Sequence, residues 1–285
     1  MHYTDFNRNH KVRFNIFILI IFFTLNFIKN IHAADKSLDF DGTNDYVEIP
    51  ANNVLNPAGA YTVAAWAKQE GENSNEVNGD HDNDFQSIIT SRTLTGSGVR
   101  GYMMYLRETT NVLSYWIGKQ TNGNFVENNT TSVSTWKANG GGNPGTPGWN
   151  HYVIRFNGTN QTSVFLDGVL LNTVTSSDTM NNQNLDKPTR IGAGDTNSDA
   201  RYWFNGKIDD VAVWDEALTD AEILELYNNG ETLYAKKNYG NYTSKDNLVA
   251  YYTMDSDNGA GTTLTDDEGN NDGSFEGAPS WSDDF

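Results

Sequence analysis

The chain has 285 residues, of which 37 are acidic and 19 basic, and it contains no cysteine. The formal net charge of −18 excludes nucleic-acid binding by phosphate neutralisation, because that mode needs a basic surface. The absence of cysteine excludes disulfide bonds, thiolate metal sites and a cysteine nucleophile. The length leaves room for one large domain or two small ones.

The N-terminal residues have the composition of an export signal. Basic residues within 8–13 precede an apolar run over 14–23, and small residues follow at Ala33 and Ala34. This order is typical of a secretory signal peptide, so we expect residues 1–33 to be removed from a secreted, extracellular or cell-surface protein. A transmembrane anchor is the alternative, but the apolar run is shorter than the ~20 residues that a span needs. We therefore expect no membrane span in the mature chain.

Short runs rich in β-branched and aromatic residues follow, separated by Gly, Asn, Asp and Ser. We expect strands over 37–41, 45–49, 61–68, 85–92, 102–107, 112–118, 151–156, 162–166, 169–175, 189–193 and 206–214. Asp167 and Gly168 predict a two-residue hairpin turn with positive φ at both positions. With about eleven strands and no long helix, the pattern predicts an all-β fold of two antiparallel sheets packed as a sandwich.

One short helix is expected after the last of these strands. The segment Thr219–Glu222 has the pattern of a capping box, which marks a helix N-terminus. Ile223, Leu226 and Tyr227 then share one face of the helix. Gly230 stands where a left-handed residue would end it.

Six sequence blocks, in chain order, carry a family resemblance. They are SLDFDGTNDYVEIP (37–50), TVAAWAK (62–68), GWNHYVIRFNGTN (148–160), VFLDGVLL (164–171), RIGAG (190–194) and FNGKIDDVAVWDEALTDAEILELYNNG (204–230). Together they resemble the concanavalin A-like, laminin-G-like jelly-roll modules of secreted bacterial surface proteins. The resemblance implies a jelly-roll domain over 36–230. It does not imply one function, because this fold hosts lectins, glycosidases and adhesion modules.

The C-terminal part of the chain has two interpretations. Residues 231–247 are polar and are expected to form a linker. Residues 248–285 resemble the segment that introduces the next copy in tandem proteins of this family, so they could begin a truncated second module. Alternatively, strands near 248–253 and 272–276 dock on the edge of the sandwich. We favour docking, because an isolated hairpin is only marginally stable in water.

Catalytic signatures are missing from the sequence. Retaining glycosidases of this fold carry the pattern E-x-D-x-x-E, and here no Asp has Glu at both −2 and +3. Beyond the signal segment the histidines are His81 and His151, and no G-x-S-x-G motif is present. We expect His151 to be a packed strand residue. The protein is therefore expected not to be an enzyme, with a glycoside hydrolase as the least favoured reading.

The resemblance also implies a structural calcium ion. In such modules a cation often joins the turn after the opening strand to the closing strand. Here the ligands would be Asp41, Gly42 and Asp45, together with Asp209. The alternative is that Asp41 and Asp45 are ordinary turn residues.

Three residues are candidates for a carbohydrate-binding face. Tyr105 and Arg107 lie on the same side of one strand by alternation, and Trp116 lies on the next strand. Sugar recognition uses aromatic faces together with planar polar groups, which these residues supply. The alternative for each aromatic residue is core packing. The predicted function is a secreted, non-catalytic module for carbohydrate binding or cell-surface adhesion, with an extracellular glycan as partner. The alternative is a structural module that binds another surface protein.

Overall fold

The computed structural model describes residues 36–71, 85–95, 98–107, 112–119, 124–130, 148–180, 183–184, 186–196, 199–228, 234–255 and 261–284. The predicted signal peptide over 1–33 lies outside the described residues. Within the described ranges, no helix is both long and apolar enough to cross a membrane.

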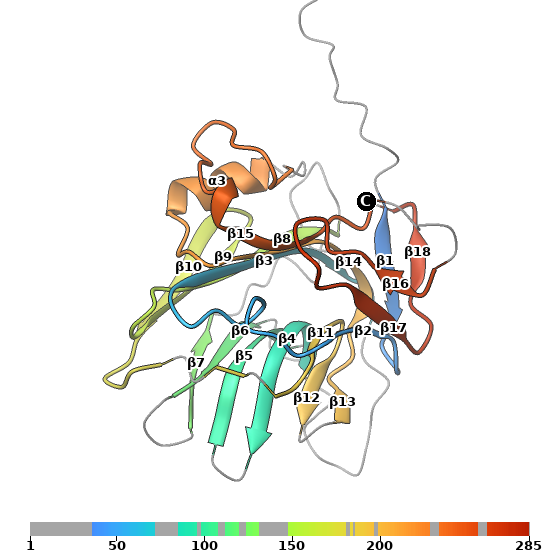
Figure 1. The fold of residues 1–285 in the computed structure, drawn as a ribbon, viewed down its shortest axis with the longest axis horizontal. Helices are drawn as coiled ribbons and strands as arrows, with labels where there is room; N and C mark the ends of the chain where they lie inside the picture. Colours follow the sequence, from blue (N-terminus) through green and yellow to red (C-terminus); the bar gives the residue numbers. More distant parts are fainter. Residues whose placement is uncertain are drawn as a thin grey trace, which may run out of the picture. The chain divides into compact units, whose positions relative to one another are not determined.

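Two antiparallel eight-stranded sheets form the fold. Sheet A contains, in spatial order, β10 (Val169–Thr175), β9 (Gln161–Leu166), β8 (Asn150–Phe156), β3 (Tyr61–Gln69), β14 (Asn205–Trp214), β1 (Ser37–Asp41) and β18 (Ser280–Ser282), and β15 (Leu248–Tyr252) also pairs with β14. Sheet B contains β16 (Thr263–Leu264), β17 (Gly273–Glu276), β2 (Tyr46–Ile49), β11 (Thr189–Ile191), β4 (Phe85–Thr95), β5 (Gly98–Arg107), β6 (Val112–Gly118) and β7 (Phe125–Asn129). The hairpin of β12 (Gly194–Thr196) and β13 (Asp199–Arg201) is separate. The predicted two-sheet antiparallel sandwich is confirmed (Figure 1).

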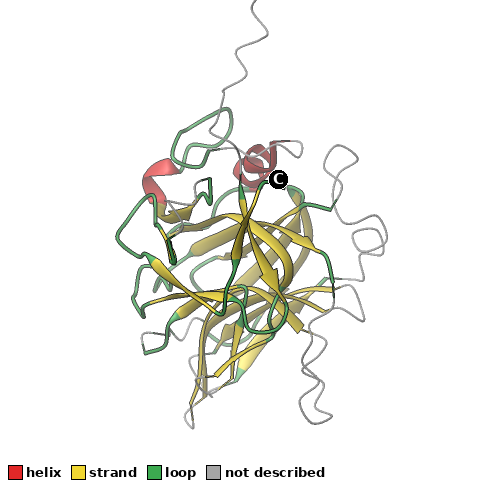
Figure 2. Ribbon diagram, turned by 90° about the vertical axis from the view of Figure 1, so that its right-hand side faces the viewer, coloured by secondary structure: helices red, strands yellow, loops and turns green. Residues whose placement is uncertain are grey.

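The two sheets enclose one main hydrophobic core. Alternation along each strand turns one set of side chains inward, as in β5, where Tyr102, Met104 and Leu106 belong to the core. The Tyr61 and Tyr115 hydroxyls, from opposite sheets, lie 2.6 Å apart within it and satisfy each other. Figure 2 shows that strands account for most of the described fold.

The β9–β10 hairpin has the turn that its sequence predicts. Asp167 has a φ of 50° and Gly168 a φ of 74°, so both central residues are left-handed. Asp167 also accepts hydrogen bonds from the backbone N–H of His151 and from the side-chain amide of Asn150, both at 2.9 Å. The turn is thus fixed to the neighbouring strand β8 as well as by its own backbone.

Helix α3 (Asp220–Tyr227) covers the outer face of sheet A. The Thr219 hydroxyl accepts from the Glu222 backbone, and the Glu222 carboxylate accepts from the Thr219 backbone, which completes the predicted capping box. The end of the helix differs from the prediction. Asn228 takes the left-handed conformation with a φ of 46°, while Gly230 lies outside the described residues. Asparagine can replace glycine there because its side chain tolerates this conformation.

The stretch expected to be a linker over 231–247 packs against the domain in its described part. Ala235 and Tyr242 are buried beside Trp214 in a second apolar cluster, on the outer face of sheet A. The Tyr242 hydroxyl donates to the Ala235 carbonyl at 2.7 Å and accepts from the Trp214 indole at 2.9 Å. The linker prediction is therefore wrong for these residues. The polar composition of this segment gave no sign that Tyr242 would be buried and would hold the segment against sheet A. The short 3-10 helix η3 (Lys245–Asn247) follows.

The last forty residues or so contribute strands to both sheets. In sheet A, β15 pairs with the second half of β14, and β18 pairs with β1. In sheet B, β17 pairs with β2, and β16 pairs with the other edge of β17. Strand β1 occupies the same edge of β14 as β15 does, with Leu38 opposite Ile208 and Val213 opposite Ala250. The first described strand and a C-terminal strand therefore share one edge of the closing strand β14 (Figure 1).

Candidate functional site

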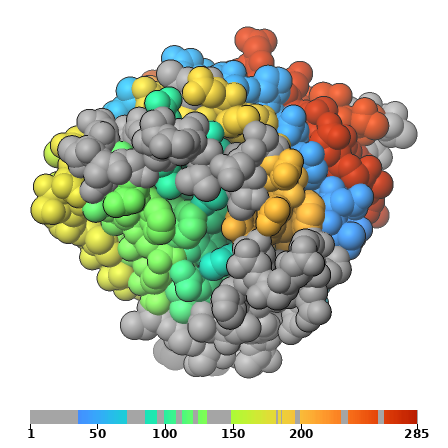
Figure 3. Space-filling model, turned by 90° about the horizontal axis from the view of Figure 1, so that it is seen from below, coloured from blue at the N-terminus to red at the C-terminus, as the bar shows by residue number. Residues whose placement is uncertain are grey.

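The outer face of sheet B, over β5, β6 and β7, brings the predicted ligand residues together. Met103, Tyr105 and Arg107 alternate with core residues of β5, so their side chains lie on this outer face. Trp116 lies on the same face of β6, directly opposite Glu127 of β7. The green atoms in Figure 3 show these strands at the molecular surface.

Glu127 is the centre of this cluster. Its Oε1 atom accepts from the Trp116 indole N–H at 2.7 Å and from the Arg107 guanidinium at 2.5 Å. The Tyr105 hydroxyl donates to the same oxygen. Three donors from two strands therefore converge on one carboxylate. We call Tyr105, Arg107, Trp116, Phe125 and Glu127 the Glu127 cluster.

An aromatic stack borders this cluster on β7. The rings of Trp116 and Phe125 lie 4.3 Å apart with an interplanar angle of 23°, and the Arg92 guanidinium lies 4.7 Å from the Trp116 ring centre. Phe125 is 38% exposed, which makes it one of the few large apolar side chains at the surface. The stack presents an aromatic surface to solvent next to an ion pair.

Tyr105 has a different position from the one expected. It is fully buried, between the rings of Phe85 at 5.0 Å and Trp116 at 5.7 Å. A ligand cannot reach a ring covered by neighbours on both sides, so Tyr105 serves to hold Glu127 in place. The Trp116 ring is likewise covered, since it lies between Phe125 and the Arg92 guanidinium. Arg107, whose side chain is 27% exposed, and the exposed Phe125 remain available for contact.

The electrostatics of the cluster keep Glu127 ionised. Burial raises the pKa of this carboxyl, but hydrogen bonds from Tyr105, Trp116 and Arg107 outweigh burial and hold the pKa below its usual value. Burial and the bond to Glu127 raise the pKa of the Tyr105 hydroxyl. Tyr105 is therefore a neutral donor and Glu127 a charged acceptor at any physiological pH.

Replacing Glu127→Gln should destabilise the fold and remove part of its acid sensitivity. The glutamine amide would leave Arg107 without its counter-ion, and its N–H₂ group could not accept the hydrogen bonds that the carboxylate accepts. We expect the free energy of unfolding to fall by about 1–3 kcal/mol. Because the folded pKa of Glu127 is lowered, its contribution is present above the unfolded pKa and is lost as pH falls through the folded pKa. Urea unfolding at pH 7 and pH 3.5 measures both effects. The exposed Glu276→Gln is the control, and an equal loss in both variants would contradict the assignment.

Sequence reasoning missed Phe125 and Glu127 because it missed the strand that carries them. The segment FVENN has two asparagines, a residue type that is depleted in strands, and it is short. Its inward residue Asn128 bonds through its side chain to Thr162 of β9 in the other sheet. Only the alternation of Phe125, Glu127 and Asn129 with Val126 and Asn128 could have indicated a strand here.

The four residues predicted to share a cation do not meet. Asp41 pairs with Asn205, and Leu38 pairs with Ile208, so Asp209 lies four residues further along β14, roughly 13 Å from Asp41. Within the described part of the chain, no group of three or more His, Cys, Asp and Glu side chains is arranged to hold a metal ion. A single site formed by Asp41, Gly42, Asp45 and Asp209 is therefore wrong, because strand register separates its halves.

The opening turn instead uses its carboxylates for backbone contacts. Asp41 accepts from the backbone N–H of Thr43 at 2.8 Å and of Asn44 at 3.3 Å. Asp45 accepts from the backbone N–H of Asp41 at 3.2 Å and of Ala278 at 2.6 Å. Calcium at this turn stays a prediction of the sequence, and other ligands than Asp209 would have to complete it.

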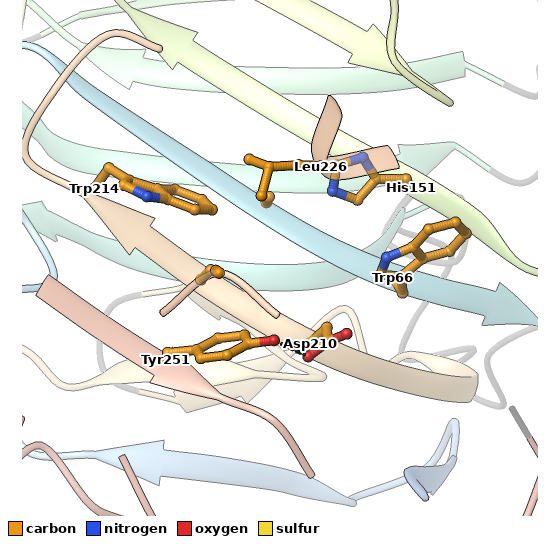
Figure 4. A pocket seen from close by; sticks show the side chains of 9 residues that line it. Trp66, His151, Asp210, Trp214, Leu226 and Tyr251 are labelled. Carbon is orange, nitrogen blue, oxygen red and sulfur yellow. Dashed lines mark hydrogen bonds between the residues drawn. The ribbon is translucent and has the colours of Figure 1, made fainter. Parts of the chain in front are cut away.

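A cavity of about 20 Å³ lies on the outer face of sheet A, under α3 (Figure 4). His151, Trp66 and Asp210 line it, and the Tyr251 hydroxyl donates to Asp210 at 2.5 Å. This volume suits about one water molecule. His151 is 3% exposed and lies 5.2 Å from the Trp66 ring, and burial lowers its pKa to about 3. His151 is thus a neutral, packed residue in a space too small for a substrate.

Comparison with known proteins places the sequence in a family. The family Laminin_G_3, described as the concanavalin A-like lectin/glucanases superfamily, matches residues 41–224. This match covers more than half of the chain, and the chain belongs to this family. None of the curated proteins matches the sequence.

Several solved structures are similar to this chain at low sequence identity. A candidate carbohydrate binding protein from Bacteroides ovatus is similar over 87% of this chain and 59% of its own, with 16% identity and a TM-score of 0.56. The CBM40 module of the Ruminococcus gnavus IT-sialidase is similar over 68% of this chain and 99% of its own, with 12% identity and a TM-score of 0.49. The K499G mutant of NanB sialidase from Streptococcus pneumoniae is similar over 68% of this chain and 28% of its own, with 14% identity and a TM-score of 0.48. This chain thus spans about three fifths of the Bacteroides ovatus chain, and the likeness concerns the fold.

Proposed function

We propose that this protein is a secreted, non-catalytic carbohydrate-binding module whose glycan face is the Glu127 cluster on sheet B. The observation that carries the proposal is the exposed Phe125 ring, stacked on Trp116 and lying beside the Arg107–Glu127 ion pair. Membership of a lectin and glucanase superfamily agrees with it. The Bacteroides ovatus neighbour, itself a candidate carbohydrate binding protein, agrees as well.

The chemistry of the cluster suits a sugar ring. An aromatic surface removes the C–H face of a pyranose from water, while charged donors and acceptors at its border bond to hydroxyl groups. Arg107 uses its Nη2 atom for Tyr105 and Glu127, which leaves Nη1 to donate to a ligand oxygen. Glu127 fixes the orientation of both Arg107 and Trp116 before any ligand arrives, which reduces the entropy lost on binding.

The proposed absence of catalysis is supported by the state of the carboxylate. Glycoside hydrolysis needs a general acid with a raised pKa and a second carboxyl group about 5–9.5 Å away. Glu127 has a lowered pKa, and three donors bond to one of its oxygens. Both features favour the ionised carboxylate, which has no proton to give to a glycosidic oxygen. Secretion rests on the N-terminal basic and apolar segments, and adhesion to a surface would follow from glycan binding.

Phe125→Ala is expected to weaken glycan binding at least tenfold, which corresponds to about 1.4 kcal/mol. The change removes the exposed ring of the stack, whereas Phe125→Trp should retain binding. A glycan array identifies the ligand, and calorimetry with that ligand measures the dissociation constants, with calcium and with EDTA. Tyr239→Ala is the matched control, because Tyr239 is 59% exposed and lies in the segment over sheet A.

Two outcomes would contradict the proposal. One is an array without any bound glycan, which would favour the alternative of a module that binds another surface protein. The other is an unchanged dissociation constant for Phe125→Ala, which would place the glycan elsewhere on the molecule. A loss of binding in EDTA would in addition support the predicted calcium ion.

A further inference from the structure

A second hollow, of about 140 Å³, lies in the C-terminal strands, outside the family match over 41–224. It is seven times the volume of the cavity beside His151. On the measure by which the cavity beside His151 suits about one water molecule, this hollow has room for several, so it suits a small ligand rather than one ion. The hollow shares no residue with the Glu127 cluster, so the two sites can be tested separately.

Two apolar residues of the core line the hollow. Met254 and Leu264, each 2% exposed, line it and also belong to the main core. Met254 has a φ of 53°, which turns the chain sharply after β15. A non-glycine residue held in this conformation is strained, so its surroundings must fix it in place. The hollow is thus formed by the fold and does not depend on a ligand.

Trp281 of β18 supplies an aromatic surface. Its strand pairs with β1, where Leu38 lies opposite Trp281, and its ring lies 5.8 Å from that of Phe275. The Nε1 atom of Trp281 is buried, while the side chain as a whole is partly exposed. What the ring offers to the hollow is therefore its carbon surface, which suits contact with the C–H groups of a sugar.

Other residues that line the hollow are polar or negatively charged. Asp255, Thr265 and Asp267 line it together with Thr253. The Asp267 carboxylate accepts from the Thr253 hydroxyl at 2.7 Å and from its backbone N–H at 3.3 Å, which fixes its orientation. None of the described residues that line the hollow carries a positive charge. Carboxylates accept hydrogen bonds from sugar hydroxyls, and they repel sugars that carry an acid group.

From this geometry we propose that the hollow is a second glycan site, which binds one neutral or amino-substituted hexopyranose ring against Trp281. Asp255 and Asp267 accept from its hydroxyl or ammonium groups, and Met254 and Leu264 support its apolar side. The same two carboxylates exclude uronic and sialic acids. The C-terminal strands thereby add a binding site to the jelly roll besides completing its sheets.

The test is a ¹⁵N NMR titration of the protein, read at the indole N–H signal of Trp281, which is assigned by its loss in Trp281→Phe. The probes are the methyl glycosides of glucose, galactose, mannose and N-acetylglucosamine, with glucosamine and galactosamine, and with glucuronic and sialic acids. At least one neutral or amino sugar should shift the signal saturably, and neither acid should. Asp255→Asn should weaken that binding at least tenfold and should admit the acids.

Asp267→Asn is the second variant, in case the first does not fold, and it should weaken binding in the same way. Phe125→Ala is the control, because it removes the glycan face of sheet B and should leave the Trp281 titration unchanged. The proposal is overturned if no sugar of the panel shifts the Trp281 signal. It is also overturned if the acids bind as tightly as the neutral sugars, or if both aspartate variants keep the wild-type dissociation constant.

Discussion

A chain that stops at Asn247 is expected to lose most of its stability, although it keeps every residue of the family match. The deletion removes β15, which pairs with Val211–Trp214 and covers the second half of the closing strand. That edge would then present unpaired backbone groups and apolar side chains to water. The same deletion removes β17 and β18, which cover the free edges of β2 and β1.

The lost burial is large compared with the stability of a domain. Leu248, Tyr251 and Tyr252 are 5%, 2% and 0% exposed, and a fully buried side chain of this size contributes about 1.5–3 kcal/mol. Three of them approach the whole net stability of a domain, about 5–15 kcal/mol. The single change Tyr252→Ala should already cost about 3–5 kcal/mol, because it leaves a cavity and removes the hydrogen bond to the Asn271 carbonyl.

Urea unfolding followed by tryptophan fluorescence measures this loss. The matched control is a chain that stops at Ser282. It removes no strand and loses the ion pairs of Asp283 with Lys36 and of Asp284 with Lys68 and Lys207, together with the hydrogen bond from the Ser37 hydroxyl to the Asp284 carbonyl. Surface contacts of this kind contribute about 0–1 kcal/mol each, so the control should lose far less stability than the chain that stops at Asn247. If the chain ending at Asn247 unfolds at the same urea concentration as the full chain, residues 248–285 do not complete this domain. They would then be the beginning of a second module.

The stability of the protein should fall between pH 7 and pH 5 because of His151. Burial lowers the pKa of this histidine from 6.5 to about 3, so in this window the unfolded chain binds a proton that the folded protein does not. Stability therefore rises with pH across the window and is lost as pH falls below the unfolded value. At pH 5 the loss from this one group is about 2 kcal/mol.

His151→Phe is the variant that tests this prediction. A phenyl ring fits the aromatic surroundings, where Trp66 lies at 5.2 Å and Tyr227 at 6.5 Å, and it has no proton to bind. The difference in unfolding free energy between pH 7 and pH 5 should be about 2 kcal/mol smaller in this variant than in the wild type. Glu127→Gln serves as the control, because its titration lies at lower pH. Equal pH dependence in wild type and His151→Phe would show that His151 is accessible to protons in the folded protein.

Local patterns in the sequence determined the elements of this protein and their faces. Alternation along 102–107 separates the core residues from Tyr105 and Arg107, and the Asp167–Gly168 pair defines its hairpin turn. The capping box at Thr219 starts α3. Each of these features depends on residues only a few positions apart. Their backbone preferences and spacing can therefore be recognised from the sequence without the rest of the fold.

Pairing between distant strands was decided by the tertiary structure alone. The register between β1 and β14 pairs Asp41 with Asn205, so Asp209 lies four residues away along β14 and the expected cation ligands do not come together. The Asn-rich strand β7 forms because β6 pairs with it, and only then does Glu127 gather Tyr105, Arg107 and Trp116. Such arrangements depend on how complete sheets pack and close their edges, which no short stretch of sequence contains.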